Sequence, residues 1–199
     1  MANKKKRADI LIDGSVVVTL DVNVIRQNGL RPGQELSQAA LLKLQEADYF
    51  QRCLDAALNF LSYRPRSESE VRQRLSRRGF DRQTIEKTVK RLKKQALIND
   101  MEFAAYWRDN RISFNPKSRF IIKKELKQKG IPSDITDTVT EGIDEEAAAL
   151  AAVRKKAVRW SNLEYEEFHI KVTNYLKWRG FNYGICEKIC RLLREENQT

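Results

Sequence analysis

Apolar residues from position 37 onward recur with helical spacing, and one block of this pattern occurs three times in the chain. Each copy has a β-branched apolar residue, a leucine four positions later, and then a cation, a glycine and a large apolar residue. The copies occupy residues 71–80, 122–131 and 172–181. Their glycines are 51 and 50 residues apart (130 − 79 and 180 − 130), which indicates an internal structural repeat.

Each copy predicts the middle of a three-helix unit. Ser67 and Ser118 precede the glycine of their copy by twelve residues, where a hydroxyl can cap a helix, and Glu70 completes a capping box with Ser67. The glycine suits the position after a helix C-terminus, where the backbone needs a positive φ. The residues expected to cap the following helix are Asp81, Ser133 and Asn182.

A further amphipathic helix is predicted upstream of each block, over residues 49–61, 100–112 and 144–160. A unit of three short helices has little core of its own, so neighbouring units are expected to stack. The predicted fold class is therefore mainly α, with three tandem three-helix repeats in an elongated, curved array.

The first part of the chain follows a different pattern. Residues 8–13 and 16–20 are β-prone and flank a turn signal, so they predict a hairpin. Asp21 can cap a short helix that ends near Gly29.

The predicted organisation is an N-terminal extension followed by three helical repeats. The extension covers residues 1–36, and the repeats cover 37–97, 98–143 and 144–199.

Charge adds the main functional clue. The 38 Lys and Arg exceed the 27 Asp and Glu, giving a net charge of +11, so phosphate or acidic protein surfaces are the expected partners. The excess is local: residues 64–95 hold twelve cations and four acids, whereas residues 134–146 hold six acids and no cation. The cations expected to form a binding face are Arg64, Arg66, Arg72, Arg77, Arg78, Lys117, Arg119, Lys123, Lys124 and Lys127.

No catalytic, metal or cofactor site is expected. His169 is the only histidine, no glycine-rich phosphate loop occurs, and Cys186 and Cys190 are expected to be buried apolar residues of one helix face. The apolar runs are too short for a membrane span and no secretory signal is evident, so a cytoplasmic, monomeric protein is expected.

Several segments resemble the RecX family when they are taken in order. The segments that resemble the family are residues 61–71 with Arg78-Gly79-Phe80, then 92–100, then 127–131. The resemblance extends over about residues 49–195. It implies three tandem three-helix repeats and a role in regulating the RecA recombinase. Proteins of this family lie along the groove of the RecA filament on single-stranded DNA and inhibit ATP hydrolysis and strand exchange.

Repeat three departs from the other two. Thr173 and Asn174 replace the lysines of repeat two, and Phe168 occupies the position of the capping serine. We therefore expect this repeat to serve packing more than binding, with Tyr175 and Trp178 contributing apolar area.

Two other functions are compatible with the sequence. The chain could be a general basic nucleic-acid-binding protein that acts without RecA, or a helical adaptor for an acidic protein. A helix-turn-helix that reads base edges is disfavoured, because the expected recognition helices carry mostly Lys and Arg.

Overall fold

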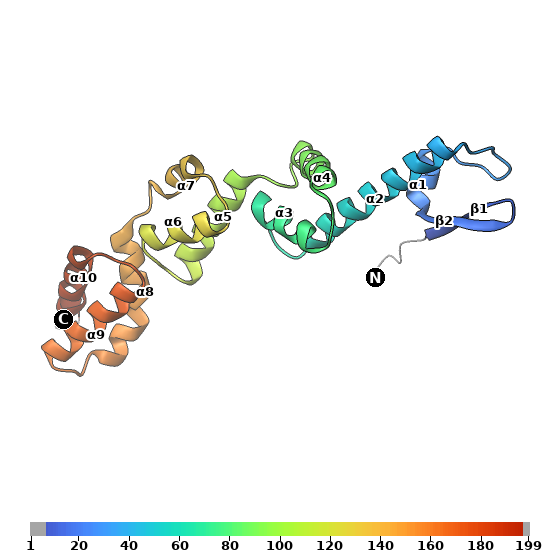
Figure 1. Ribbon diagram of the computed structural model, residues 1–199. Helices are drawn as coiled ribbons and strands as arrows, with labels where there is room; N and C mark the ends of the chain where they lie inside the picture. Colours follow the sequence, from blue (N-terminus) through green and yellow to red (C-terminus); the bar gives the residue numbers. More distant parts are fainter. Residues whose placement is uncertain (1–6, 197–199) are drawn as a thin grey trace. The chain divides into compact units, whose positions relative to one another are not determined.

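The helical periodicity is realised as ten helices within residues 7–196, the part of the chain that a computed structural model describes (Figure 1). A two-stranded antiparallel sheet precedes them. The strands are β1 (Arg7–Ile12) and β2 (Ser15–Asp21), and the helices are α1 (Val22–Gln27), α2 (Gln38–Leu61), α3 (Glu68–Arg77), α4 (Arg82–Lys94), α5 (Asp100–Phe114), α6 (Arg119–Gln128), α7 (Ser133–Thr140), α8 (Glu145–Trp160), α9 (Tyr165–Trp178) and α10 (Tyr183–Glu196). The mainly α fold class is confirmed.

The predicted hairpin and the short helix after it are also confirmed. Asp21 caps α1, its side chain accepting a hydrogen bond from the Asn23 amide. Asp48 of α2 is only 5% exposed and accepts hydrogen bonds from the Asp21 amide at 2.7 Å and the Arg7 guanidinium at 3.0 Å. This buried carboxylate fastens the hairpin to α2.

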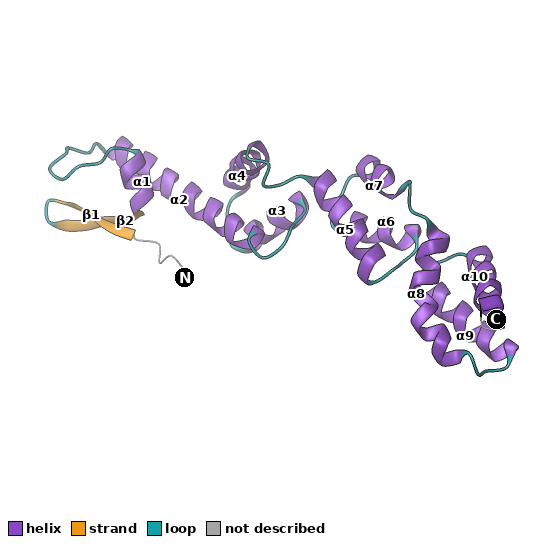
Figure 2. Ribbon diagram, turned by 180° about the vertical axis from the view of Figure 1, so that it is seen from behind, coloured by secondary structure: helices purple, strands orange, loops and turns teal. Residues whose placement is uncertain are grey.

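The helices group in threes, as Figure 2 shows for each copy of the repeat. Repeat one comprises α2, α3 and α4, repeat two comprises α5, α6 and α7, and repeat three comprises α8, α9 and α10. The described chain divides into two compact units, one holding residues 7–66 and 71–97 and the other holding residues 67–70 and 98–196. The first turn of α3 thus belongs to the second unit.

The predicted caps of the middle helices are confirmed. The Ser67 hydroxyl accepts from the Glu70 amide at 3.1 Å while the Glu70 carboxylate accepts from the Ser67 amide at 3.2 Å, and Ser118 caps α6. The prediction for Ser133 is wrong. Pro132 precedes α7 in an extended conformation, so Ser133 is the first helical residue and its hydroxyl makes no capping bond.

Within the second unit, the glycine turns of repeats two and three receive the N-termini of the middle helices that precede them in sequence. The Ser67 hydroxyl donates to the Lys129 carbonyl at 2.7 Å, and the Ser118 amide donates to the Arg179 carbonyl at 3.1 Å. Both accepting carbonyls stand directly before a glycine, Gly130 in the first case. The two junctions are therefore built alike.

A carboxylate supports each junction from the first helix of the receiving repeat. Asp100 accepts the Glu68 amide at 2.8 Å, and Glu145 accepts the Arg119 amide at 2.9 Å. Free amides at a helix N-terminus need acceptors, and a negative charge there also complements the helix dipole.

The glycine is required at these junctions for two reasons. Gly130 and Gly180 have φ of +76° and +86°, which disfavours a side chain. A Cβ at Gly130 would also overlap Ser69, and one at Gly180 would overlap Ile121 and lie 2.6 Å from the Ser118 hydroxyl oxygen. The absence of a side chain is what allows the close approach.

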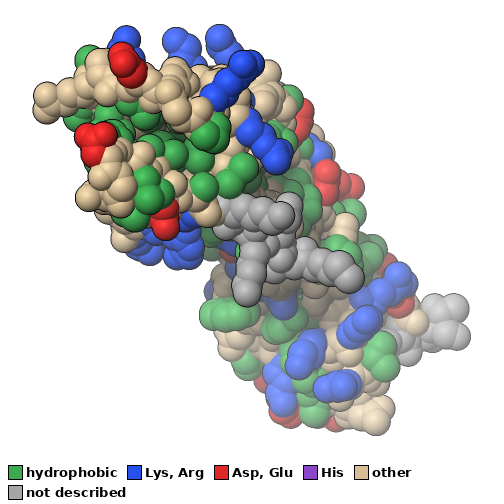
Figure 3. Space-filling model, turned by 90° about the vertical axis from the view of Figure 1, so that its right-hand side faces the viewer, with side chains coloured by type: hydrophobic (Ala, Val, Ile, Leu, Met, Phe, Trp, Pro, Cys, Tyr) green, Lys and Arg blue, Asp and Glu red, His purple; other side chains and the backbone are tan. Residues whose placement is uncertain are grey.

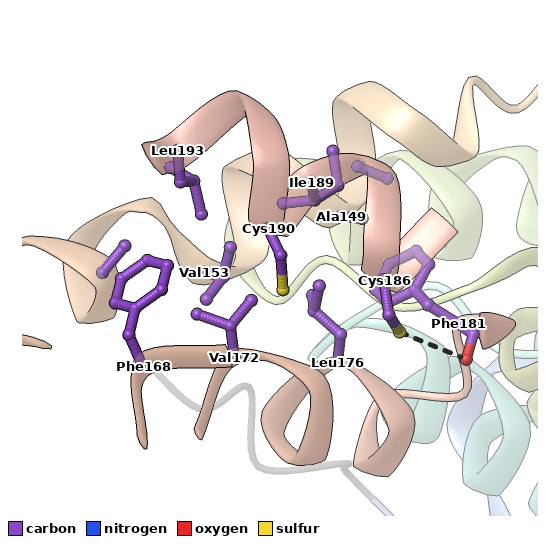
Figure 4. Close-up of a cluster of buried hydrophobic side chains, with 12 residues drawn as sticks. Ala149, Val153, Phe168, Val172, Leu176, Phe181, Cys186, Ile189, Cys190 and Leu193 are labelled. Carbon is purple, nitrogen blue, oxygen red and sulfur yellow. Dashed lines mark hydrogen bonds between the residues drawn. The ribbon is translucent and has the colours of Figure 1, made fainter. Parts of the chain in front are cut away.

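Repeat three has a continuous apolar core of twelve buried residues, built from all three of its helices (Figure 4). Phe168, at the position of the capping serines, is 1% exposed and lies in this core. Cys186 and Cys190 are buried free thiols, as expected, and the Cys186 thiol points to the Phe181 carbonyl at 3.9 Å.

We predict that Gly180→Ala destabilises the protein more than Gly79→Ala. Gly79 has the same type of backbone (φ +83°), but its added Cβ would meet no described atom within 4 Å. Backbone strain alone gives Gly79→Ala a cost of about 1 kcal/mol, and overlap adds about 1–3 kcal/mol at Gly180. Urea unfolding followed by circular dichroism measures both, and equal losses would contradict the close packing at Gly180.

Candidate nucleic-acid interface

The ten cations predicted to form a binding face fall into two groups in the structure. One group is paired or half-buried: Arg64, Arg66, Arg72, Lys117, Arg119 and Lys123. The other group is exposed and has no ion pair within residues 7–196: Arg77, Arg78, Lys124 and Lys127. The second group is the part of the face that is open to a partner.

Two of the paired cations occupy equivalent places. Arg72 donates to both carboxylate oxygens of Glu86 at 2.5 and 3.0 Å, and Lys123 donates to Asp137 at 2.5 Å. In each pair the cation lies seven residues before the glycine and the acid seven residues after it. The hydrogen bond from Lys123 lowers the pKa of Asp137. These pairs bridge the second and third helices, and at a solvated surface such bridges contribute little stability.

Glu125 collects three donors in repeat two. Its carboxylate accepts from the Trp107 indole at 2.8 Å, the Arg111 guanidinium at 2.6 Å and the Lys117 amine at 2.5 Å. Burial alone would raise its pKa, but the hydrogen bonds from Arg111, Lys117 and Trp107 together lower it. Lys117 therefore acts within the fold, since its charge is used to satisfy a carboxylate that is 16% exposed.

An exposed aromatic side chain lies between the first and the middle helix in two repeats. Tyr63 is in the loop after α2, and Phe114 is the last residue of α5. Tyr63 is 84% exposed and Phe114 is 82% exposed, and each lies sixteen residues before the glycine of its repeat. Beside Tyr63, the Arg66 guanidinium lies 4.1 Å from the centre of the Phe60 ring. Sequence reasoning missed this pair of aromatics, although the shared pattern aromatic-x-Pro-cation-Ser at 63–67 and 114–118 could have revealed it.

Two further arginines join Arg78 in a place that the sequence did not indicate. Arg7 and Arg52 line a cavity of about 400 Å³ with Arg78, Asn59 and Phe80. Their positions are far apart in the chain, so only the packing of the hairpin against α2 and the glycine turn brings them together.

Charge on the visible surface is dispersed. Figure 3 shows Lys and Arg side chains in several places on one face, with Asp and Glu side chains between them. Of the ten predicted cations, the four exposed ones without an ion pair in the described residues are the ones that a partner could reach.

Two polar side chains of the middle helix of repeat three have partners inside the repeat. Thr173 is 6% exposed and lies against the Cys190 thiol at 3.7 Å, and His169 contacts Glu187 at 2.6 Å. Tyr175 packs on Trp160 as expected. Trp178 does not contribute to the core: it is 79% exposed, because it lies at the C-terminal end of α9 on the solvent side.

The described residues offer little other chemistry. No group of three or more His, Cys, Asp or Glu side chains could hold a metal ion there. Burial raises the pKa of the Cys53, Cys186 and Cys190 thiols, which disfavours the nucleophilic thiolate. Among residues 7–196, none of the helices is long and apolar enough to span a bilayer.

We predict that Glu125→Gln lowers the free energy of unfolding by about 2 kcal/mol at neutral pH, because three donors lose a charged acceptor. The pKa of Glu125 is lower in the folded chain than in the unfolded chain. Its stabilising effect is therefore full above the usual glutamate pKa and is lost as the pH falls through the folded pKa.

Urea unfolding at several pH values tests this prediction. The difference between wild type and Glu125→Gln should shrink as the solution is acidified from neutral pH. Glu141→Gln is a suitable control, because Glu141 is exposed. A difference that grows on acidification would contradict the assignment.

Known proteins resemble this chain in both sequence and fold. Family models of RecX match it twice, as the first three-helix domain over residues 53–92 and as the second three-helix domain over residues 99–139. A regulatory protein RecX of Listeria welshimeri is 32% identical over 186 residues, which cover 92% of this chain and 69% of that protein. A regulatory protein RecX of Bacillus pumilus is 28% identical over 189 residues, which cover 94% of this chain and 72% of that protein.

Two solved structures are similar as well. A crystal structure of regulatory protein RecX aligns with a TM-score of 0.72 and 26% identity, covering 95% of this chain and 94% of that one. The crystal structure of RecX from Lactobacillus salivarius aligns with a TM-score of 0.65 and 28% sequence identity. The alignment covers 74% of this chain and 97% of that one. The match covers a smaller share of some relatives: it spans 57% of the length of a regulatory protein RecX of Listeria monocytogenes.

Proposed function

This chain belongs to the RecX family, and from that membership we propose that it regulates RecA by binding the RecA filament on single-stranded DNA. Binding inhibits ATP hydrolysis and strand exchange by bridging neighbouring filament subunits, so it uses no catalytic step, and it takes place in the cytoplasm. The sequence repeats at 37–97, 98–143 and 144–199, behind an extension at 1–36, are the proposed modules.

One observation of the structure supports this mode of binding. Exposed cations without an acidic partner among the described residues occur in equivalent helices of repeats one and two: Arg77 at the end of α3, and Lys124 and Lys127 in α6. Phosphates and acidic protein lobes are the partners that such cations attract. Several weak contacts made by linked modules add up to a high net affinity.

The exposed aromatics favour a second candidate, direct binding to a single strand without RecA. Tyr63 lies in the loop before α3 and Phe114 ends α5, and both are close to cations in the sequence. Aromatic side chains in basic surroundings stack on nucleobases without sequence preference. Retention by RecA filaments and by naked single strands at matched salt separates the two. Equal retention favours the candidate without RecA.

We predict that the wild-type chain inhibits the ATPase activity of RecA on single-stranded DNA. The triple variant Arg77→Glu/Lys124→Glu/Lys127→Glu should raise the half-inhibitory concentration about tenfold or more, because three attractive contacts become repulsive. The measurement is a titration of each variant into a steady-state ATPase assay.

Lys43→Glu/Lys155→Glu/Arg159→Glu is the matched control, with the same change in net charge at exposed positions outside this set. The control should inhibit as the wild type does. Equal losses in both variants would show that only net charge matters, and a wild type without any inhibition would contradict the proposed function.

A further inference from the structure

A cation precedes the glycine in every repeat, and in two repeats it binds oxygen acceptors. The Lys129 amine contacts the Glu70 carboxylate at 3.2 Å. The Arg179 guanidinium donates to the Asn115 side-chain oxygen at 2.7 Å and to the Pro116 carbonyl at 2.8 Å. This position is thus suited to oxygen acceptors on the surface beside the glycine turn.

In repeat one the same position is open. Arg78 is exposed and forms no ion pair with the described part of the chain, and a Cβ at Gly79 would meet nothing within 4 Å there. The segment that covers this surface in repeats two and three has no counterpart at Gly79. Arg78 is left with a guanidinium whose donors have no acceptor among residues 7–196.

Two differences between repeats one and two open a cavity next to Arg78. Ala56 and Trp107 both lie 23 residues before their glycines (79 − 56 and 130 − 107). In repeat two the Lys129 amine lies 4.1 Å from the centre of the Trp107 ring, whereas in repeat one the small Ala56 lines the 400 Å³ cavity. An aromatic ring is replaced by open space.

A second substitution adds charge to that space. Arg52 is the repeat-one counterpart of Phe103, since both precede their glycines by 27 residues (79 − 52 and 130 − 103). Phe103 is 2% exposed in the core of repeat two, whereas Arg52 is exposed and lines the cavity. The position that packs in the core of repeat two is thus occupied in repeat one by a cation that lines the cavity.

The cavity carries a net positive charge. Arg7 is partly neutralised by Asp48 at 3.0 Å, but Arg52 and Arg78 have no carboxylate partner in the described residues. Asn59 adds an amide that can donate. Phe80 forms an apolar wall, held in place by its ring contact with Tyr49 at 5.4 Å between centroids.

We propose that the Arg7–Arg52–Arg78 cavity binds a backbone phosphate of a single DNA strand, an inference that rests on the proposed binding of single-stranded DNA. Guanidinium forks match phosphate oxygens in pairs. The volume exceeds what a lone carboxylate fills, and the Phe80 wall gives the adjoining sugar or base an apolar surface.

Fluorescence anisotropy with a labelled oligothymidylate and the full chain tests the proposal without RecA. Arg52→Ala/Arg78→Ala should raise Kd about tenfold, and the slope of log Kd against log salt should fall by about 0.7 for each lost phosphate contact. Lys43→Ala/Lys94→Ala is the charge-matched control, with exposed cations outside the cavity, and should change both quantities little. Inorganic pyrophosphate should compete with the oligonucleotide in wild type and less in the double variant.

The outcomes separate this proposal from the proposed function. Equal loss in both double variants, or an unchanged salt slope, overturns the phosphate site. Unchanged DNA affinity together with weakened inhibition of RecA also overturns it, because the cavity would then bind an acidic surface of the recombinase. If the wild type does not bind DNA, the phosphate site is overturned, even where RecA is still inhibited. If the wild type binds DNA but does not inhibit RecA, the site stands and the proposed function is contradicted.

Discussion

The second unit depends on the close packing of a helix N-terminus on a glycine turn. Ser67 and Ser118 bring their helices so near to Gly130 and Gly180 that a single methyl group would overlap them. A carboxylate from the first helix of the receiving repeat then satisfies an amide of the arriving helix. Apolar contact alone is non-directional, so these short polar contacts are what fix the register of the packed segments within the second unit.

The same junction explains how a repeated sequence can serve two purposes. A cation beside a glycine turn either holds a neighbouring segment, as Arg179 does, or remains available to an outside acceptor, as Arg78 does. The cations beside the glycine turns therefore differ in their contacts because their neighbours differ, while the backbone of each turn is of the same type. Substitution of Phe103 and Trp107 by Arg52 and Ala56 reinforces the difference.

Local features were predictable from the sequence, because caps, glycine turns and hairpins depend on residues close together in the chain. Asp21, Ser67 and Ser118 were placed correctly for this reason. The partners of the cations were not, since Glu86 reaches Arg72 only across a glycine turn. The cavity was missed because Arg7 and Arg78 meet only through tertiary packing, and Trp178 was wrongly given to the core because helical spacing does not show where a helix leaves its neighbours.

Hydrogen–deuterium exchange with and without RecA filaments on single-stranded DNA tests the central claim, that the unpaired cations of repeats one and two form the binding surface. The account predicts slower exchange on filament binding in peptides that cover residues 71–80 and 122–128. Slower exchange confined to the acidic segment 134–146 or to repeat three, or no change anywhere, would contradict it.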